Sequence, residues 1–348
     1  MDRAKVSVIV PAYNCESYIG ATLGSLLAQT LQGVQIICVD DCSTDKTPEI
    51  IAQKARQNEN IVFIRLPQNR GVACARNEGL KHASAEFIMF CDGDDLCHGD
   101  MCRQMYEAML SSGADLAAAQ AEVRYDIPAT DELKKADEKY FSLKYSGMQS
   151  VSVDLFLNTD VCIWDKIFKK SIIDEYQISF PEGLLYEDLY FTMAYLAASK
   201  NMFFLKRPLY FYYRRKGSIM SKTFEDGRTA IDHIFIMFRL YDFLDRISAV
   251  RKYSGLFPKL FLSYYNLAVR FSPKDARQKI WQTSRDFIIE RGLLKKFRNS
   301  LRIKSIYENR PNLTFAEKIF SAKNSWDLKY KIITIFGLGI KVRRNLKK

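Results

Sequence analysis

Short apolar runs, each ended by polar residues, alternate with helical patterns through the first hundred residues of the chain. The runs that read as strands fall at 5–10, 35–40, 61–66 and 86–91. Between the first two runs, residues 16–29 carry apolar side chains at helical spacing, and further helices should follow 45–48 and 69–71. This order of strands and helices predicts an α/β fold with a mostly parallel sheet, right-handed crossovers and helices on its faces.

The pattern changes after the fourth strand. Residues 114–125 predict another strand, 126–150 a polar and charged connection, and the tyrosine-rich run 210–213 a strand with one buried face. From about residue 226 onward the apolar positions follow a helical period. We therefore expect an α/β domain over residues 1–222 and a helical region over 223–348.

Charge divides the chain in a similar way. Of the 348 residues, those at 201–348 include 33 Lys/Arg and 11 Asp/Glu, whereas those at 1–200 include 19 and 29. Such asymmetry indicates two functional regions, because the acidic part can hold a metal ion and the basic part should meet an anionic partner. No recognised nucleic-acid-binding motif accompanies the basic charge, so we expect no nucleic acid as partner.

Composition indicates a soluble globular protein of the cytoplasm. Hydrophobic residues make up 48% of the chain, and no apolar stretch approaches the roughly 18 to 20 residues of a membrane span. The first residues run straight into a strand, without the pattern of a signal peptide. The eight cysteines lie in the first half, without paired Cys-x-x-Cys sets, which favours reduced structural thiols.

Acidic residues follow two of the predicted strands. Asp92, Asp94 and Asp95 come directly after the buried run at 86–91, and Asp40-Asp41 ends the run at 35–40. Open α/β sheets place their ligands at the carboxyl ends of strands, and hard carboxylate oxygens suit Mg²⁺ or Mn²⁺. The alternative for the 92–95 stretch is a plain acidic turn, with Asp95 capping the next helix. No Gly-x-Gly-x-x-Gly follows the first strand and no Gly-Lys-Ser/Thr occurs, which disfavours dinucleotide-binding and P-loop sites.

Four blocks of residues, in this order and spacing, resemble those of the family-2 glycosyltransferases. The blocks are Pro11-Ala12-Tyr13-Asn14, Val39-Asp40-Asp41-Cys42-Ser43-Thr44-Asp45, Asn69-Arg70-Gly71-Val72-Ala73-Cys74-Ala75-Arg76-Asn77 and Cys91-Asp92-Gly93-Asp94-Asp95. The resemblance extends over roughly residues 5–220. It implies the GT-A fold, a nucleotide-sugar donor that is commonly a UDP-sugar, Mn²⁺ or Mg²⁺ as cofactor, and inversion at the anomeric carbon.

The resemblance also implies roles for residues on the donor side. It places the following residues in or beside the nucleoside pocket: Pro11, Tyr13, Asp41, Asn69 and Arg76. Arg76 would in addition neutralise phosphate charge, for which a guanidinium is well shaped, although a lone helix arginine is more often simply solvated. Asp92 would contact the ribose or the diphosphate, and Asp94 would be the direct metal ligand.

On the acceptor side the resemblance implies that Asp188 is the general base. The pair Glu187-Asp188 matches the family's Glu-Asp pair ahead of a helix; from the residues alone, two acids at a helix start are more often a helix-stabilising signal. Trp164 and Lys166 resemble an acceptor-side block, although a single Trp is more often part of the core. Tyr212, Arg214 and Ser218 resemble a late block near the diphosphate.

The sequence departs from the family pattern at a few positions. Cys42 stands where the family usually has Gly, Cys91 where it usually has an aliphatic residue, and His98-Gly99 where a Pro is common. None of these departures removes an essential group.

The function that these residues imply is transfer of a sugar to an acceptor hydroxyl by a single in-line displacement. The acceptor would be a saccharide or a lipid-linked molecule of surface polysaccharide or glycolipid synthesis. The alternatives are a nucleotide-binding protein without catalysis and a membrane-associated scaffold that uses the basic region.

The last segment, 326–348, mixes apolar residues with lysines and arginines. As an amphipathic helix it would lie on an anionic membrane surface, placing the protein peripherally at the inner face of the cell membrane. The alternative is a helix that closes the acceptor side or forms a dimer interface.

Overall fold

The computed structural model describes residues 4–215, 228–298, 300–308, 321–324, 330–335 and 338–343. The chain divides into two compact units, one of residues 1–225 with 235–257, the other of residues 226–234 with 258–348. The domain boundary expected at 222 and 223 stays a prediction, as does the separate functional role of the two parts; residues 235–257, expected in the second region, belong to the first unit.

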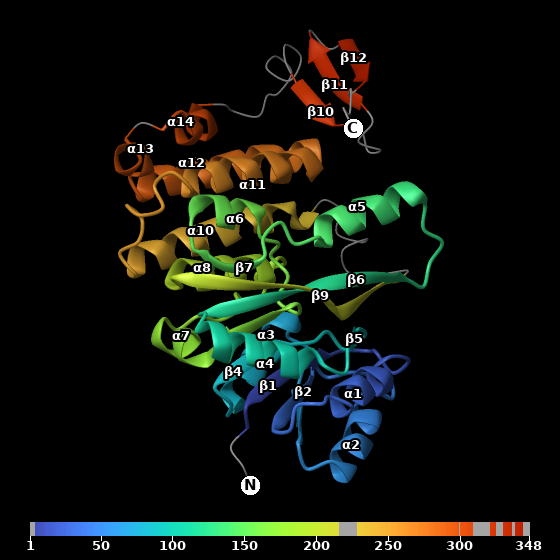
Figure 1. Ribbon diagram of the computed structural model, residues 1–348. Coiled ribbons are helices and arrows are strands. Elements are labelled where there is room, and N and C mark those ends of the chain that lie inside the picture. The colour runs from blue at the N-terminus through green and yellow to red at the C-terminus, as the bar shows by residue number, and fades with distance from the viewer. Residues whose placement is uncertain are drawn as a thin grey trace. The chain divides into compact units, whose positions relative to one another are not determined.

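Four parallel strands form the first half of the main sheet (Figure 1). They are β1 (Val6–Ala12), β2 (Val34–Asp40), β3 (Ile61–Arg65) and β4 (Phe87–Phe90), in the spatial order β3-β2-β1-β4. The predicted alternation of strands and helices is confirmed here, and the carboxyl ends of β1, β2 and β4 meet at one edge.

The second half of the sheet mixes both strand directions. Its strands are β5 (Leu96–Cys97), β6 (Leu116–Tyr125), β7 (Gly147–Ser150), β8 (Lys166–Lys169) and β9 (Asn201–Arg214). Strand β8 runs antiparallel to both β4 and β6, whereas β6 and β9 are parallel. The long strand β9 also pairs with β5, so it reaches the chain segment that directly follows the acidic stretch at 92–95.

The connection expected at 126–150 contains a helix, α5 (Asp131–Phe141), and strand β7. Helix α5 buries only Asp137 and Phe141, so its sequence lacks a continuous apolar face. The hydroxyl of Thr130 caps it by accepting a hydrogen bond from the amide of Leu133. With only these two buried residues and a capping hydroxyl, the helix leaves no strong periodic pattern of apolar residues in the sequence.

Helices of the first unit cover both faces of the sheet. Their bounds are α1 (Ile19–Leu27), α2 (Thr47–Gln57), α3 (Val72–His82), α4 (Met101–Ser112), α6 (Val153–Asn158), α7 (Lys170–Glu175) and α8 (Glu187–Ala198). Alternate residues of β1 point to opposite faces: Val8 joins the core with α1 and α4, whereas Ile9 contacts α3. A Cβ on Gly79 would lie 2.4 Å from the Ile9 side chain, so this glycine lets α3 pack closely on β1.

The C-terminal region is helical up to residue 308, as expected. Its elements are a 3₁₀ turn (Arg228–Ile231), α10 (Asp232–Arg246), α11 (Phe257–Phe271), α12 (Lys274–Glu290), α13 (Leu293–Lys296) and α14 (Leu301–Glu308). None of the helices among the described residues has the length and apolar character needed to cross a bilayer.

The last segment differs from the expected amphipathic helix. Strands β10 (Ser321–Asn324), β11 (Tyr330–Ile335) and β12 (Leu338–Arg343) form an antiparallel sheet. Residues 332, 333 and 335 are isoleucines, whose branched Cβ favours strands over helices. The helical prediction for 326–348 was therefore wrong where the segment is described.

Candidate active site

A tight acidic turn follows β4 and packs on the end of β1. A Cβ on Gly93 would lie 2.8 Å from the carbonyl oxygen of Pro11, so only glycine permits this close approach. The hydroxyl of Tyr210 accepts a hydrogen bond from the amide of Asp92 (3.1 Å) and donates one to the carboxylate of Asp95 (2.9 Å). One tyrosine from β9 thus fixes both ends of the turn.

Asp95 is buried and holds β9 rather than capping a helix. Its carboxylate also accepts a hydrogen bond from the amide of Tyr213 (2.9 Å), and the next helix, α4, begins only at Met101. Burial raises the pKa of Asp95 to about 8, with the negative charges of Asp92 and Asp94 adding to the effect. The expected helix cap is therefore replaced by an anchor between the turn and β9.

Arg76 on α3 joins the acidic turn to the start of α8. Its guanidinium pairs with Asp92 at 2.8 Å and with Glu187 at 2.5 Å, and the side chain is buried. We expected this arginine at the nucleoside or phosphate side of a donor. The structure instead shows it as a bridge that brings the acids of two distant chain segments, β4 and α8, to one place.

Asp188 lies beside this bridge, in the first turn of α8. Tyr186, just before the helix, adopts a left-handed backbone conformation with φ of 66°, which sets the direction of the first turn. One carboxylate oxygen of Asp188 accepts a hydrogen bond from the amide of Leu189 at 2.7 Å. Burial, followed by the charge of Glu187, raises the pKa of Asp188 to about 7, while Arg76 opposes the shift.

The remaining donor-side residues gather at the ends of β1 and β2. Asp41 is buried, and its carboxylate accepts hydrogen bonds from the amides of Arg70 (2.8 Å) and Gly71 (2.7 Å). It therefore shapes the loop that carries the exposed Asn69 ahead of α3. Pro11 is buried at the end of β1, whereas the ring of Tyr13 is exposed beside it and open to a ligand.

Two residues expected on the acceptor side lie in the interior. Trp164 is buried and stacks on Tyr210 and Tyr212, with ring centroids 4.5 and 5.5 Å apart. Lys166 is 0% exposed, and its ammonium lies between the carboxylates of Asp160 (2.6 Å) and Asp165 (2.8 Å). Both side chains are therefore part of the interior, and their role toward an acceptor stays a prediction.

Arg214 also lies elsewhere than expected. Its guanidinium forms a two-pronged ion pair with the buried Asp137 of α5, with one contact at 2.6 Å. Ser218, the other residue of the expected late block, lies outside the described residues. Glu187, expected near the acceptor, is the partner of Arg76 described above.

Sequence reasoning missed Arg215, which contacts the acidic turn directly. Its Nη1 lies 3.0 Å from the carboxylate of Asp94 and 3.7 Å from that of Asp95. Arg215 lies just beyond the end of β9, which ends at Arg214, so the alternation of the strand does not place its side chain. The amide of Tyr213 donates a hydrogen bond to Asp95, and the Arg215 side chain reaches the same turn. No pattern in the sequence distinguishes Arg215 from Arg214.

The acidic turn fits a metal held partly by a substrate. Asp94 has the more open carboxylate, 45% exposed, against 27% for Asp92. No group of three or more His, Cys, Asp or Glu side chains is arranged around a metal position within the part of the chain that is described. Mg²⁺ in nucleotide enzymes is commonly bound by one or two carboxylates together with substrate phosphates, and oxygen ligands also suit Mn²⁺.

Cys42, at one of the positions that depart from the family pattern, adopts φ of 60°. A side chain in this left-handed region costs about 1–2 kcal/mol, partly offset by the greater freedom that glycine has when unfolded. We expect Cys42→Gly to raise the free energy of unfolding by about 0.5 kcal/mol and Cys42→Val, with its branched Cβ, to lower it by about 1 kcal/mol or more. Urea denaturation of both variants measures this order, and a valine variant as stable as the glycine variant would contradict it.

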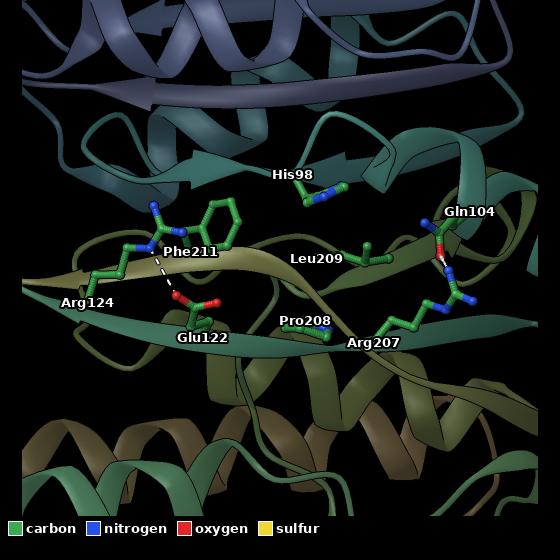
Figure 2. Close-up of a pocket in the computed structure, with 8 residues that line it drawn as sticks. All are labelled: His98, Gln104, Glu122, Arg124, Arg207, Pro208, Leu209 and Phe211. Carbon is green, nitrogen blue, oxygen red and sulfur yellow. Dashed lines mark hydrogen bonds and ion pairs between the residues drawn. The ribbon is translucent and has the colours of Figure 1, made fainter.

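A pocket of about 440 Å³ is lined by residues of α4, β6 and β9 together with His98 (Figure 2). Figure 2 shows Arg124 over the ring of Phe211 and its hydrogen bond to Glu122. The guanidinium carbon lies 3.7 Å from the ring centroid. None of the expected site residues that the structure describes lines this pocket. Arg124 of this pocket already has an aromatic and an acidic partner. We therefore place the candidate active site at the acidic turn and α8.

Comparisons with known proteins point in one direction. The sequence profile of "Glycosyl transferase family 2" matches residues 7–176. Glycosyltransferase GlyA of Streptococcus pneumoniae is 28% identical over 221 residues, 62% of this chain and 31% of GlyA, so the chain spans about a third of that relative. Putative glycosyltransferase EpsH of Bacillus subtilis is 30% identical over 243 residues, 65% of this chain and 67% of EpsH.

TarS of Staphylococcus aureus, a poly(ribitol-phosphate) beta-N-acetylglucosaminyltransferase, is 30% identical over 229 residues, 63% of this chain and 37% of TarS. The structure of TarS residues 1–349 in complex with UDP-GlcNAc superposes with a TM-score of 0.56 at 21% identity, covering 98% of this chain and 99% of that one. This likeness confirms the GT-A type of fold.

Proposed function

Because the chain belongs to glycosyltransferase family 2, we propose that it transfers a sugar from a UDP-sugar to an acceptor hydroxyl, with inversion at the anomeric carbon. The observation that carries this proposal is the bridge formed by Arg76. It holds Asp92 of the acidic turn and Glu187 of α8 on one guanidinium, which leaves the neighbouring Asp188 outside the ion pair. The bridge supports the proposal because it brings the acidic turn, which we propose to face the diphosphate, next to the carboxylate that we propose as the base.

In this proposal Asp188 is the general base. Its pKa of about 7 means that a large fraction is deprotonated at neutral pH while it still binds a proton well. It takes the proton from the acceptor hydroxyl as the oxygen attacks the anomeric carbon and the bond to the diphosphate breaks. Glu187 and the left-handed turn at Tyr186 position the carboxylate, and Arg76 limits how far its pKa rises.

On the donor side, we propose that Tyr13 and Asn69 contact the nucleoside, because both are exposed near the ends of β1 and β2. Asp41 positions the loop that carries Asn69, because its carboxylate accepts hydrogen bonds from the amides of residues 70 and 71. Asp94, and Asp92 beside it, would hold Mn²⁺ or Mg²⁺. When bound, the metal would offset the negative charge that develops on the leaving UDP.

UDP release from a panel of UDP-sugars in Mn²⁺ tests the proposal without a known acceptor, because water replaces the hydroxyl. We expect slow release from at least one donor, and its loss in Asp94→Asn. A thermal shift by UDP without release from any donor would indicate a nucleotide-binding protein without catalysis. The absence of both a thermal shift and UDP release would contradict the proposal altogether.

The rate of sugar transfer should depend on the pKa of Asp188. Burial has raised this pKa to about 7, and the base acts only when deprotonated, so kcat/KM should fall about tenfold per pH unit below about pH 7 and level off above it. A pH profile of UDP release from pH 5.5 to 8.5 measures this limb. A flat profile across pH 6 to 8 in the wild-type protein would contradict the assignment.

For the acceptor, we propose a saccharide of a surface polymer or glycolipid, supported by the relation to TarS, whose acceptor is named as poly(ribitol-phosphate). We also propose that the basic C-terminal region places the enzyme at the inner face of the cell membrane. Residues 201–348 contribute 33 Lys/Arg and 11 Asp/Glu, a net charge that favours an anionic surface. Co-sedimentation with anionic and neutral liposomes tests the location, and equal recovery with both would contradict it.

A further inference from the structure

The acidic turn already contains a cation, supplied by the protein. The guanidinium of Arg215 lies 3.0 Å from Asp94, 3.7 Å from Asp95 and 3.1 Å from Asp126, measured between the charged nitrogen and oxygen atoms. Three acidic side chains from two chain segments therefore surround one positive charge. Because the pKa of Asp95 is about 8, Asp94 and Asp126 are the acids whose charge this guanidinium offsets at neutral pH.

Arg215 is held in this position as a built feature rather than as a loose surface side chain. Its side chain is 10% exposed and lies between the rings of Tyr18 and Tyr213, with the guanidinium carbon 4.2 and 4.6 Å from the two centroids. Both contacts are within the range of favourable cation–π interaction. The Nε atom is buried and lies 3.1 Å from the carboxylate of Asp126, without a hydrogen bond to any of the described residues.

Asp94 faces both this guanidinium and solvent. Its carboxylate is 45% exposed, so it is open to a metal ion on one side while Arg215 binds it on the other. A divalent cation at Asp94 and the guanidinium at 3.0 Å would repel each other. A diphosphate beside the turn would attract both cations, because guanidinium and metal each bind phosphate oxygens well.

We propose that Arg215 is the resident counter-ion of the acidic turn, that it keeps free divalent metal from Asp94, and that the donor diphosphate admits the metal by drawing Arg215 away. The first step, exclusion of free metal by Arg215, concerns only this chain and a metal ion. The last step, displacement of Arg215 by the donor diphosphate, rests on the proposed function. Arg215 is thus a positioning residue: metal by itself binds weakly, and UDP-sugar and metal bind together.

Titration with Mn²⁺ in the absence of nucleotide, followed by the paramagnetic resonance of free Mn²⁺, tests the first step. We expect Arg215→Gln to bind Mn²⁺ at least about tenfold more tightly than the wild type, because removing one charge at contact distance is a large electrostatic change. Arg215→Lys, which retains the charge, should resemble the wild type. The matched control is Arg214→Gln, which removes the neighbouring arginine paired with Asp137 and should leave Mn²⁺ binding unchanged.

The double variant Arg215→Gln/Asp94→Asn should lose the tight binding, which locates the metal at the turn. Equal Mn²⁺ affinity in Arg215→Gln and the wild type would overturn the inference, as would tight binding that persists without Asp94. Circular dichroism verifies that each variant is folded, and Arg215→Lys provides a second test if the glutamine variant does not fold: Mn²⁺ affinity changed tenfold in that variant would also overturn it.

A second titration adds UDP. Wild-type Mn²⁺ affinity should rise at least about tenfold with saturating UDP, whereas Arg215→Gln should gain much less, because its site is already open. An equal gain in Mn²⁺ affinity in both proteins would overturn the proposal that the diphosphate admits the metal by drawing Arg215 away. Because the first titration contains no nucleotide, failure of the donor proposal would leave its result intact, so the two failures can be told apart.

Discussion

Asp188→Asn is expected to lower the rate of UDP-sugar turnover by about 10²- to 10⁴-fold, the range that a general base contributes. Asparagine keeps the shape of the side chain and an oxygen that can accept the hydrogen bond from the Leu189 amide, which is 2.7 Å long in the wild type. It cannot take a proton from the acceptor. The loss should therefore appear in kcat, while the thermal shift produced by UDP stays the same.

The control for this variant is Asp174→Asn on α7, where an exposed carboxylate pairs with Lys170. That substitution should leave turnover unchanged, because surface ion pairs contribute little and the residue is not part of the site. Turnover by Asp188→Asn within a factor of two of the wild type would show that another group serves as the base.

Lys166→Met should produce the largest loss of stability, about 3–5 kcal/mol in the free energy of unfolding. The ammonium of Lys166 is fully buried and binds Asp160, Asp165 and the carbonyl oxygen of Cys162. Without it, two buried carboxylates are left next to each other. Burial and the charge of Asp160 already raise the pKa of Asp165 to about 7 with the lysine present. Removal of the lysine would force these carboxylates to become protonated or exposed to solvent.

Urea denaturation measures this loss, with Lys170→Met as the matched control. Lys170 also pairs with an aspartate, but at the surface, so its removal should cost less than about 1 kcal/mol. The contrast separates the burial of the charge from the loss of a lysine as such. Equal stability of the two variants would contradict the structural role given to Lys166.

Much of the first half of the fold follows from local pattern. Strands β1, β2 and β4 are mostly apolar runs, buried on both faces, and each run ends in residues that cannot stay in the sheet. The acidic turn after β4 and its separate acids were therefore visible in the sequence, although Asp95 proved to anchor β9 instead of a helix. The expectation that Asp188 belongs to the same site came only from the resemblance to the family.

The remainder depends on contacts between distant segments. The burial of Lys166 requires Asp160 and Asp165 on both sides, and the bridge by Arg76 requires α3, β4 and α8 to meet. Choosing between Arg214 and Arg215 requires the contacts made at and just beyond the end of β9, where Arg214 pairs with Asp137 and Arg215 with Asp94. Strands β11 and β12 show that a mixed basic and apolar sequence is compatible with both the helical and the strand period, so the pairing between strands decides which one forms.

A single displacement at the anomeric carbon, with Asp188 as base, determines the configuration of the sugar that is formed first. Real-time proton magnetic resonance can follow hydrolysis of whichever α-linked UDP-sugar the donor panel identifies. We expect the β-anomer to appear first and then to equilibrate by mutarotation. Initial appearance of the α-anomer would mean retention through a covalent or otherwise different course and would rule out the single displacement.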